Sequence, residues 1–429
     1  MFNAKRIEHL LVLCLMLGTF QLYTPFKVTR YILCLILQLI SLLKISKYSN
    51  INSIPFYSSL HRYVLILLFN VSVFISFFLI GAKSDDIVNR VLPLISMYGI
   101  IIFLDDRIGL DRERILRLFS YSYVILALVV NIDACAYIFT GVSLWPPMIY
   151  VSDRFSGPFE DPNFMALFSA SIFFVFYTIE KDLIRWRRLS LGILFVNILL
   201  AGSFSTLAFI PFTIFLYRYT KRLTNLKKQI IILVGYFAFI SFYAALNKQI
   251  EKSVVEVLYN IIGSYELAEI KYGSLQIRLD TQSAAVSKFC SEWWGQGPLQ
   301  LVPQLKHDAH NSYVSMMFEQ GIFGLLMILC TLNNKRPSKI ESRMGTYLML
   351  SALLLNVHDC SIYSLFVLTQ HTKLRGFLKV YRGGYTKAGI TNGMDKCRED
   401  LHVFPGCSQV DTEKPRDQKN LHSDQTKSI

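Results

Sequence analysis

Two polar stretches of this 429-residue chain lie between strongly apolar segments and carry side chains suited to binding an anion beside a hydroxyl. The first, RFSGPFEDPN at 154–163, begins with an arginine, whose planar guanidinium can hold a phosphate through two parallel hydrogen bonds. The second, from about 247 to 310, contains Arg278 and ends at His310. An imidazole at this place can accept a proton from a hydroxyl near neutral pH.

Structural roles are also open to these residues. Asp161 or Asn163 can cap the helix that begins there, and Pro162 suits its first turn, so only Arg154 is left without a structural reason. His310 is either a general base or a helix-capping, interfacial residue. Motif spacing alone leaves both interpretations of His310 open.

Aromatic and polar residues near the second stretch allow two interpretations as well. Trp293 and Trp294 either anchor the chain at lipid headgroups or stack on sugar rings. Asn311, Ser315 and Glu319 are one turn apart, so they share one face of the helix that follows. A polar stripe inside a membrane span usually faces the bundle interior or a wet cavity. Glu319 is therefore either an interhelical hydrogen-bond partner or part of a site.

Composition indicates what kind of element positions these residues. With 53% hydrophobic and 17% charged residues, and a mean hydropathy of +0.39, the chain is typical of a membrane protein. Since a helix needs about 20 apolar residues to cross the hydrocarbon, we predict an all-α polytopic membrane protein with about twelve transmembrane helices. The expected spans lie near 8–24, 28–45, 63–82, 88–104, 118–140, 163–180, 189–202, 205–219, 229–246, 311–330, 344–357 and 360–372.

Orientation follows from the positions of the basic residues. With both termini in the cytoplasm, about three quarters of the 44 Lys and Arg residues fall in cytoplasmic segments, as the positive-inside rule requires. We predict helical hairpins at 189–219 and 344–372, because a single helix at either place would export a basic cluster. The net charge of +14 then reflects topology, and no nucleic-acid partner is expected.

This topology defines the expected organisation of the chain. Residues 1–372 form the membrane domain, with periplasmic loops at about 141–162 and at 247–310, the one long periplasmic loop. Residues 373–429 form a polar cytoplasmic tail. The first apolar run lacks a small-residue cleavage site and is expected to remain as an anchor. The eight cysteines include no C-x-x-C pair, so neither a zinc site nor a disulfide framework is predicted.

An ordered set of motifs links the two stretches to a known family. The motifs are Arg154-Phe155-x-Gly157-x-Phe159-x-Asp161-Pro162-Asn163, Arg278, Gly295-x-Gly297, His310-Asn311-x-Tyr313 and Glu319-x-Gly321-x-x-Gly324. In this order they resemble the O-antigen polymerase and ligase superfamily of bacterial inner membranes. Two departures stand out: many relatives carry Ser-Arg between the two short helices of the 189–219 hairpin, where this chain reads Gly202-Ser203-Phe204-Ser205-Thr206, and the R-x10-G pattern of some polymerases is absent.

The resemblance implies a glycosyltransferase that joins undecaprenyl-diphosphate-linked oligosaccharide repeat units into O-antigen or capsule-type polysaccharide at the periplasmic face, with no cofactor and no metal. Arg154 and Arg278 would grip the donor pyrophosphate, and His310 would orient or deprotonate the attacking sugar hydroxyl. The expected partners are the lipid bilayer and a chain-length regulator and flippase of the same pathway. The residues expected to bind substrate are Asn163, Asn311, Tyr313, Glu319, Trp293 and Trp294.

Two other functions remain open. One is the sibling ligase, which transfers the finished glycan to lipid A core; the HNSY form at 310–313 and the separate element at 154–163 favour the polymerase. The other is a flippase or transporter of lipid-linked oligosaccharides. Transporters usually show repeat symmetry between their halves, whereas this chain concentrates its polar residues in one asymmetric region.

Overall fold

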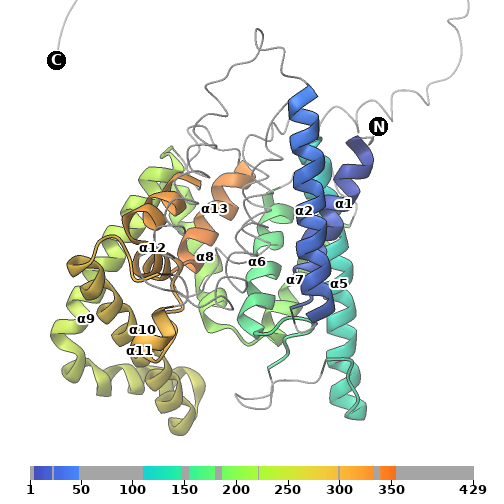
Figure 1. The fold of residues 1–429 in the computed structure, drawn as a ribbon. Coiled ribbons are helices and arrows are strands. Elements are labelled where there is room, and N and C mark those ends of the chain that lie inside the picture. Colours follow the sequence, from blue (N-terminus) through green and yellow to red (C-terminus); the bar gives the residue numbers. More distant parts are fainter. Residues whose placement is uncertain are drawn as a thin grey trace, which may run out of the picture. The chain divides into compact units, whose positions relative to one another are not determined.

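The computed structural model describes residues 4–21, 24–47, 110–145, 154–178, 186–220, 222–297, 300–331 and 339–353. Every regular element in these ranges is an α-helix, so the predicted all-α class is confirmed for the described part of the chain. The predicted spans at 63–82, 88–104 and 360–372 and the predicted tail lie outside it. The helices are α1 (Ala4–Leu17), α2 (Thr24–Lys47), α5 (Arg112–Thr140), α6 (Pro162–Thr178), α7 (Arg187–Leu200), α8 (Phe204–Thr220), α9 (Asn225–Ile262), α10 (Tyr265–Ser291), α11 (Leu301–Leu305), α12 (Ser312–Thr331) and α13 (Lys339–Ser351) (Figure 1).

Two of the described helices contain segments that are long and apolar enough to cross a membrane. These segments are Glu113–Thr140 of α5 and Asn225–Tyr243 of α9, and α6 is apolar but shorter. The number of about twelve spans therefore stays a prediction.

The predicted break of residues 189–219 into two helices is confirmed. Helix α7 ends before Gly202, which has a left-handed backbone with a φ of 56°, and α8 begins at Phe204. Glycine adopts this conformation without steric cost, which is why it ends so many helices. Of the second predicted hairpin, 344–372, the structure describes residues up to 353, and α13 ends at Ser351.

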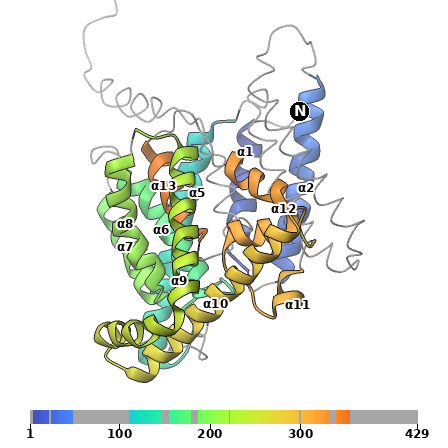
Figure 2. The same cartoon turned by 90° about the vertical axis from the view of Figure 1, so that its left-hand side faces the viewer.

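The region 247–310, predicted as one long periplasmic loop, is largely helical, and its place in the periplasm stays a prediction. Helix α9 continues to Ile262, and α10 follows after a two-residue turn and packs against it (Figure 2). Gly263, with a φ of 77°, closes α9, while the Ser264 hydroxyl accepts from the Leu267 N–H and caps α10. No proline occurs between Pro211 and Pro298, so nothing interrupts helix formation there.

Helices α10 and α12 pack together and run in the same direction. The Gln282 side-chain amide donates to the Ala309 carbonyl just before α12. Further along both segments, the Gln296 N–H donates to the Phe318 carbonyl. Later residues of one segment therefore contact later residues of the other, so α10 is parallel to α12 and not antiparallel to it.

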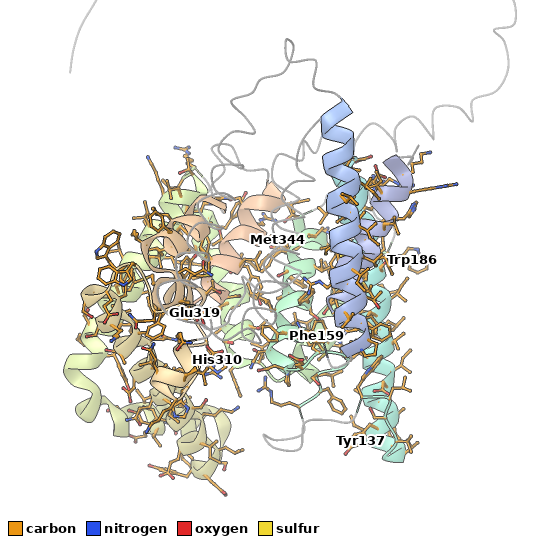
Figure 3. All side chains as sticks on the ribbon, viewed as in Figure 1. Tyr137, Phe159, Trp186, His310, Glu319 and Met344 are labelled. Atoms are coloured by element: carbon orange, nitrogen blue, oxygen red, sulfur yellow. The ribbon has the colours of Figure 1, made fainter. Side chains whose placement is uncertain are left out.

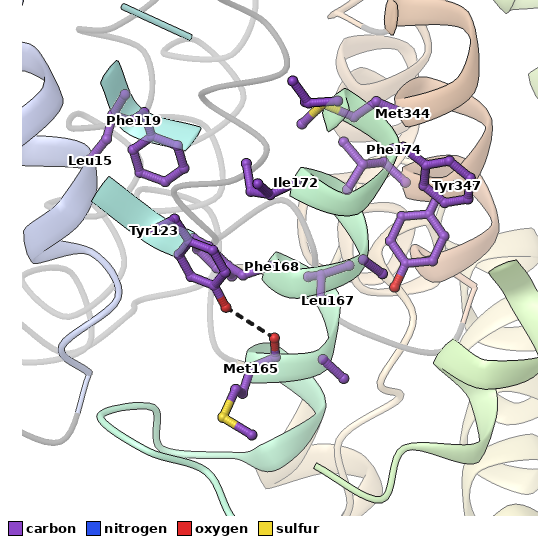
Figure 4. Packing of buried hydrophobic residues seen from close by; sticks show 14 of the residues in the cluster. Leu15, Phe119, Tyr123, Met165, Leu167, Phe168, Ile172, Phe174, Met344 and Tyr347 are labelled. Carbon is purple, nitrogen blue, oxygen red and sulfur yellow. Dashed lines mark hydrogen bonds between the residues drawn. The ribbon is translucent and has the colours of Figure 1, made fainter. Parts of the chain in front are cut away.

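Helix α6 is fixed in a core of aromatic rings and hydrogen bonds. Phe119, Tyr123, Phe168, Phe174 and Tyr347, from α5, α6 and α13, are buried together (Figure 4). The Tyr123 hydroxyl donates to the Met165 carbonyl at 3.2 Å, as the dashed line in Figure 4 marks. This core holds the N-terminal end of α6, where the motif at 154–163 leads in.

A chain of buried side chains also joins α5, α6 and α7. The Ser169 hydroxyl donates to the Asn197 side-chain oxygen at 2.7 Å. The Asn197 amide donates in turn to the Asn131 side-chain oxygen at 3.0 Å. Hydrogen bonds of this kind between apolar helices hold their register, because an unpaired polar group there would be costly.

Candidate active site

Phenylalanines anchor the backbone around Arg154. Phe155 and Phe159 are buried, and the Phe155 N–H donates to the Leu200 carbonyl at the end of α7. Gly157 has a φ of 55°, and a Cβ there would lie 2.8 Å from a Val130 methyl carbon. The R-F-x-G-x-F pattern thus describes a chain that bends tightly over the core, with Arg154 placed beside α7.

The Arg154 side chain is held by two hydrogen bonds. Its Nε donates to the Ala201 carbonyl at 2.8 Å, and its Nη2 donates to Asn163 Oδ1 at 3.0 Å. Asp161 accepts from the Asn163 N–H at 2.7 Å, so it caps α6 and leaves the Asn163 side chain free for Arg154. A Cβ at Gly202 would lie only 3.3 Å from Arg154 Cγ. Gly202 therefore makes room for Arg154.

Arg278 and Lys271 add two further cations from α10. They are seven residues apart, or two helical turns, and therefore share one face of the helix. Neither side chain makes a hydrogen bond or an ion pair with any residue in the described part of the chain. A half-buried guanidinium without partners is a ready binding group for an oxyanion.

Electrostatic coupling shows that these cations lie close to Arg154. Burial lowers the pKa of Arg154, and Arg278 lowers it further, against the opposing effect of Asp161. Burial likewise lowers the pKa of Lys271, and both arginines lower it further. The pKa of Arg278 is lowered by burial, while Asp161 and Asp308 oppose this shift. Three positive charges that disfavour one another would be stabilised by a bound anion.

His310 belongs to the same cluster. Its backbone is left-handed, with a φ of 48°, a conformation in which His is enriched among non-glycine residues. The Asp308 carboxylate accepts from the His310 N–H at 3.2 Å and lies 4.0 Å from Nδ1. Burial, and then Arg278, lower the pKa of His310, while Asp308 and Asp161 oppose the shift. The imidazole is therefore neutral near pH 7, as a general base must be. Figure 3 labels His310, which lies just before the start of α12.

Asn311 and Tyr313 build the helix behind His310. Asn311 is fully buried, and its Oδ1 accepts from the N–H groups of Tyr313 and Val314, so it caps α12. Tyr313 is also fully buried, and its hydroxyl accepts from Gln229 of α9 at 3.2 Å. Both side chains are directed into the protein, and they fix the start of the helix that follows His310.

A break in α12 explains the glycine motifs. Gly321 has a φ of 63° and a ψ of −151°, a conformation open almost only to glycine. The segment 293–297 crosses the helix at this point, and the Ile322 N–H donates to the Trp293 carbonyl at 2.9 Å. A Cβ on Gly295 would lie 2.5 Å from the Gly321 nitrogen. The motifs at 295–297 and 319–324 are therefore the two sides of one close backbone contact.

The structure divides the predicted site residues into two groups. In the first group, Arg278 lowers the pKa of Arg154 and of His310, and Asn163 accepts a hydrogen bond from Arg154. Asn311 and Tyr313 directly follow His310, but their side chains are buried within the protein. Glu319, which is 3% exposed, lies more than two helical turns beyond His310, at the Gly321 break. The two tryptophans of segment 293–297 pack edge to face there, with exposed fractions of 55% and 47%.

Lys271 is the member of the cluster that motif comparison misses. No family motif includes it, and it lies in a segment that hydropathy indicates to be a loop. The sequence feature that could have indicated Lys271 is its seven-residue spacing from Arg278. This spacing places the two residues on one face only if both lie on the same helix.

Comparison with known proteins adds nothing to this assignment. The chain has no match among protein-family models, curated proteins or solved structures. Within the described residues, no three His, Cys, Asp or Glu side chains gather closely enough to hold a metal ion.

Proposed function

We propose that this protein is a polytopic membrane glycosyltransferase that polymerises undecaprenyl-diphosphate-linked repeat units into O-antigen or capsule-type polysaccharide at the periplasmic face of a bacterial inner membrane. One observation carries the proposal. Arg154, Arg278 and His310 come from three separate segments, yet the charge of Arg278 lowers the pKa of both Arg154 and His310, as only a neighbouring group does. The cluster combines two arginines for an anion with a neutral imidazole for a hydroxyl.

Exposed apolar faces support the membrane assignment. Only 39% of each candidate span is buried within the protein, whereas the core helix of a soluble protein would be mostly buried. On α5, Ile125, Ile132 and Ile138 are each about 60% exposed, and on α9 so are Val234 and Phe242. Apolar side chains exposed in this way suit contact with lipid.

The cluster suits displacement of a lipid diphosphate. In the proposed reaction, an acceptor sugar hydroxyl attacks the anomeric carbon of the donor, a new C–O bond forms, and the bond to the diphosphate oxygen breaks. The leaving diphosphate keeps the electron pair, so negative charge grows on its oxygens. Arg278 would bind this charge together with Arg154, which uses two of its five N–H donors within the protein. His310 would take the hydroxyl proton.

Chain growth by the purified protein is the direct test. Full-length protein in detergent or vesicles is given a lipid-diphosphate-linked repeat unit, and the products are separated by length. We expect chains of many units from wild type and single units from His310→Ala. Transfer only to lipid A core would identify a ligase instead, and transport without bond formation would identify a flippase.

Deletion of the gene tests the same proposal in the cell. Loss of a polymerase should leave lipopolysaccharide with core plus a single repeat on a gel. Wild-type gene supplied in trans should restore the ladder, and the His310→Ala gene should not. A full ladder of long chains in the deletion strain would contradict the proposal.

A further inference from the structure

The face of α10 that carries Arg278 has a second cation without a partner. Lys271 makes no hydrogen bond or ion pair with any residue that the structure describes. Lys288 on the same helix behaves as a structural lysine usually does, because its Nζ lies 2.9 Å from Glu292. A lysine that is half-buried among other cations costs stability, so a function should account for it.

Charges in the cluster leave room for an anion. The charges of Arg154 and Arg278 act on Lys271, whereas Asp161 acts on both arginines and Asp308 on Arg278. Each carboxylate already has a role in the backbone: Asp161 caps α6, and Asp308 accepts from the His310 N–H. The cluster therefore has excess positive charge and free donors on the cations.

The spacing along α10 suits an anion with two phosphate groups. Lys271 and Arg278 are separated by about 10 Å along the helix axis, and both have long side chains that can converge on neighbouring groups. Arg154 approaches from another segment and is fixed by Ala201 and Asn163. Each arginine can hold one phosphate, and a third cation adds attraction that favours a diphosphate, because it carries more negative charge than a single phosphate.

We infer that Lys271 is the third cation of the donor site and gives it a preference for a diphosphate over a single phosphate. The inference rests on the proposed function and deepens it, because it assigns recognition of the two-phosphate group to a residue outside the family motifs.

Anion binding by the full-length protein in detergent tests the inference without relying on catalysis. Titration calorimetry with inorganic pyrophosphate and with orthophosphate compares wild type with Lys271→Ala, Lys271→Arg and the matched control Lys288→Ala. We expect wild type to prefer pyrophosphate, and Lys271→Ala to lose about tenfold in pyrophosphate affinity with little change for orthophosphate. Lys271→Arg should recover most of the loss, and Lys288→Ala should match wild type.

Three results would overturn the inference: no preference for pyrophosphate in wild type, an equal loss for both anions in Lys271→Ala, or the same loss in Lys288→Ala. The chain-growth assay separates this failure from failure of the proposed function. If wild type polymerises and Lys271→Ala has the same KM for the lipid diphosphate, the inference about Lys271 is wrong and the proposed function stands. If the protein transfers no glycan but its preference for pyrophosphate depends on Lys271, the diphosphate site stands and the proposed glycosyltransferase activity is wrong.

Discussion

Arg154 and Arg278 are both half-buried, yet their surroundings differ. Arg154 donates two hydrogen bonds, to the Ala201 carbonyl and to Asn163. Arg278 makes no hydrogen bond or ion pair within the described part of the chain. The geometry of the fork should therefore matter most at Arg278, where all donors are available to a ligand.

Arg278→Lys keeps the charge but loses the planar pair of donors. We expect chain-growth activity to fall on the order of 10- to 100-fold, because donors aimed at a developing oxyanion contribute this much. Protein accumulation in the membrane should not change, since Arg278 holds no neighbour in place. Arg188→Lys, at an exposed position of α7, is the matched control. Unchanged chain length in Arg278→Lys would remove this residue from the site.

The pH dependence of activity should report His310. A lowered pKa keeps the imidazole neutral below its usual 6.5, so the acidic limb of the rate profile should lie below pH 6.5. Asp308 raises this pKa, so Asp308→Asn should move the limb to lower pH while the asparagine oxygen still accepts from the His310 N–H. Asp280→Asn, exposed on α10, should leave the limb in place. A limb that moves upward in Asp308→Asn would contradict the role of His310 as a base.

At the residue scale, motifs found Arg154, Arg278 and His310 but not Lys271. Arg154 precedes Phe155 and Gly157, and His310 precedes Asn311 and Tyr313, in combinations that are recognisable in a sequence, whereas Arg278 was identified by its place between these motifs. Lys271 depends on a helical face, and the charges on α10 made this segment resemble a loop. The two roles that the sequence left open at Asp161 and Asn163 could be separated only by the fold, because the partner of Asn163 is Arg154.

Among the elements, α12 depends on its break at Gly321. Gly321→Ala should destabilise the protein by about 2–5 kcal/mol, since alanine is strained in this conformation and its Cβ would lie 2.3 Å from the Trp294 carbonyl carbon. Thermal unfolding in detergent measures the loss. Gly235→Ala is the matched control, because nothing lies within 4 Å of a Cβ there and alanine favours a helix. Equal stability of the two variants would argue against the break.

The boundaries of α6, α7, α8 and α12 were predicted to within two residues, whereas the end of α1, the start of α5 and the helical nature of 247–310 were not predicted. Hydropathy recognises a helix by its apolar length, and α10 has too many charges for that test. The absence of proline was visible, but absence of an interruption does not identify a helix. The crossing of segment 293–297 over Gly321 depends on contacts between distant residues, which spacing cannot give.

For the whole molecule, the site requires Arg154, Arg278 and His310 to share one side of the membrane. Alkaline phosphatase fused after Ser264, between α9 and α10, should be active, because this turn is expected in the periplasm. A fusion after Arg222, between α8 and α9, should be inactive because a basic cluster keeps this connection in the cytoplasm. Activity of the second fusion would mean that α9 has the opposite orientation in the membrane. Arg154, Arg278 and His310 would then lie on the cytoplasmic side.

The two hydrogen bonds that hold Arg154 have a kinetic consequence for a reaction that is repeated many times on one growing chain. The conformational entropy of this long side chain is lost once, during folding, and not again at each addition. Orientation of the donor can then be strict without making the spent lipid carrier hard to release. In the proposed polymerase, this arrangement would let turnover remain fast while the geometry of each addition stays the same.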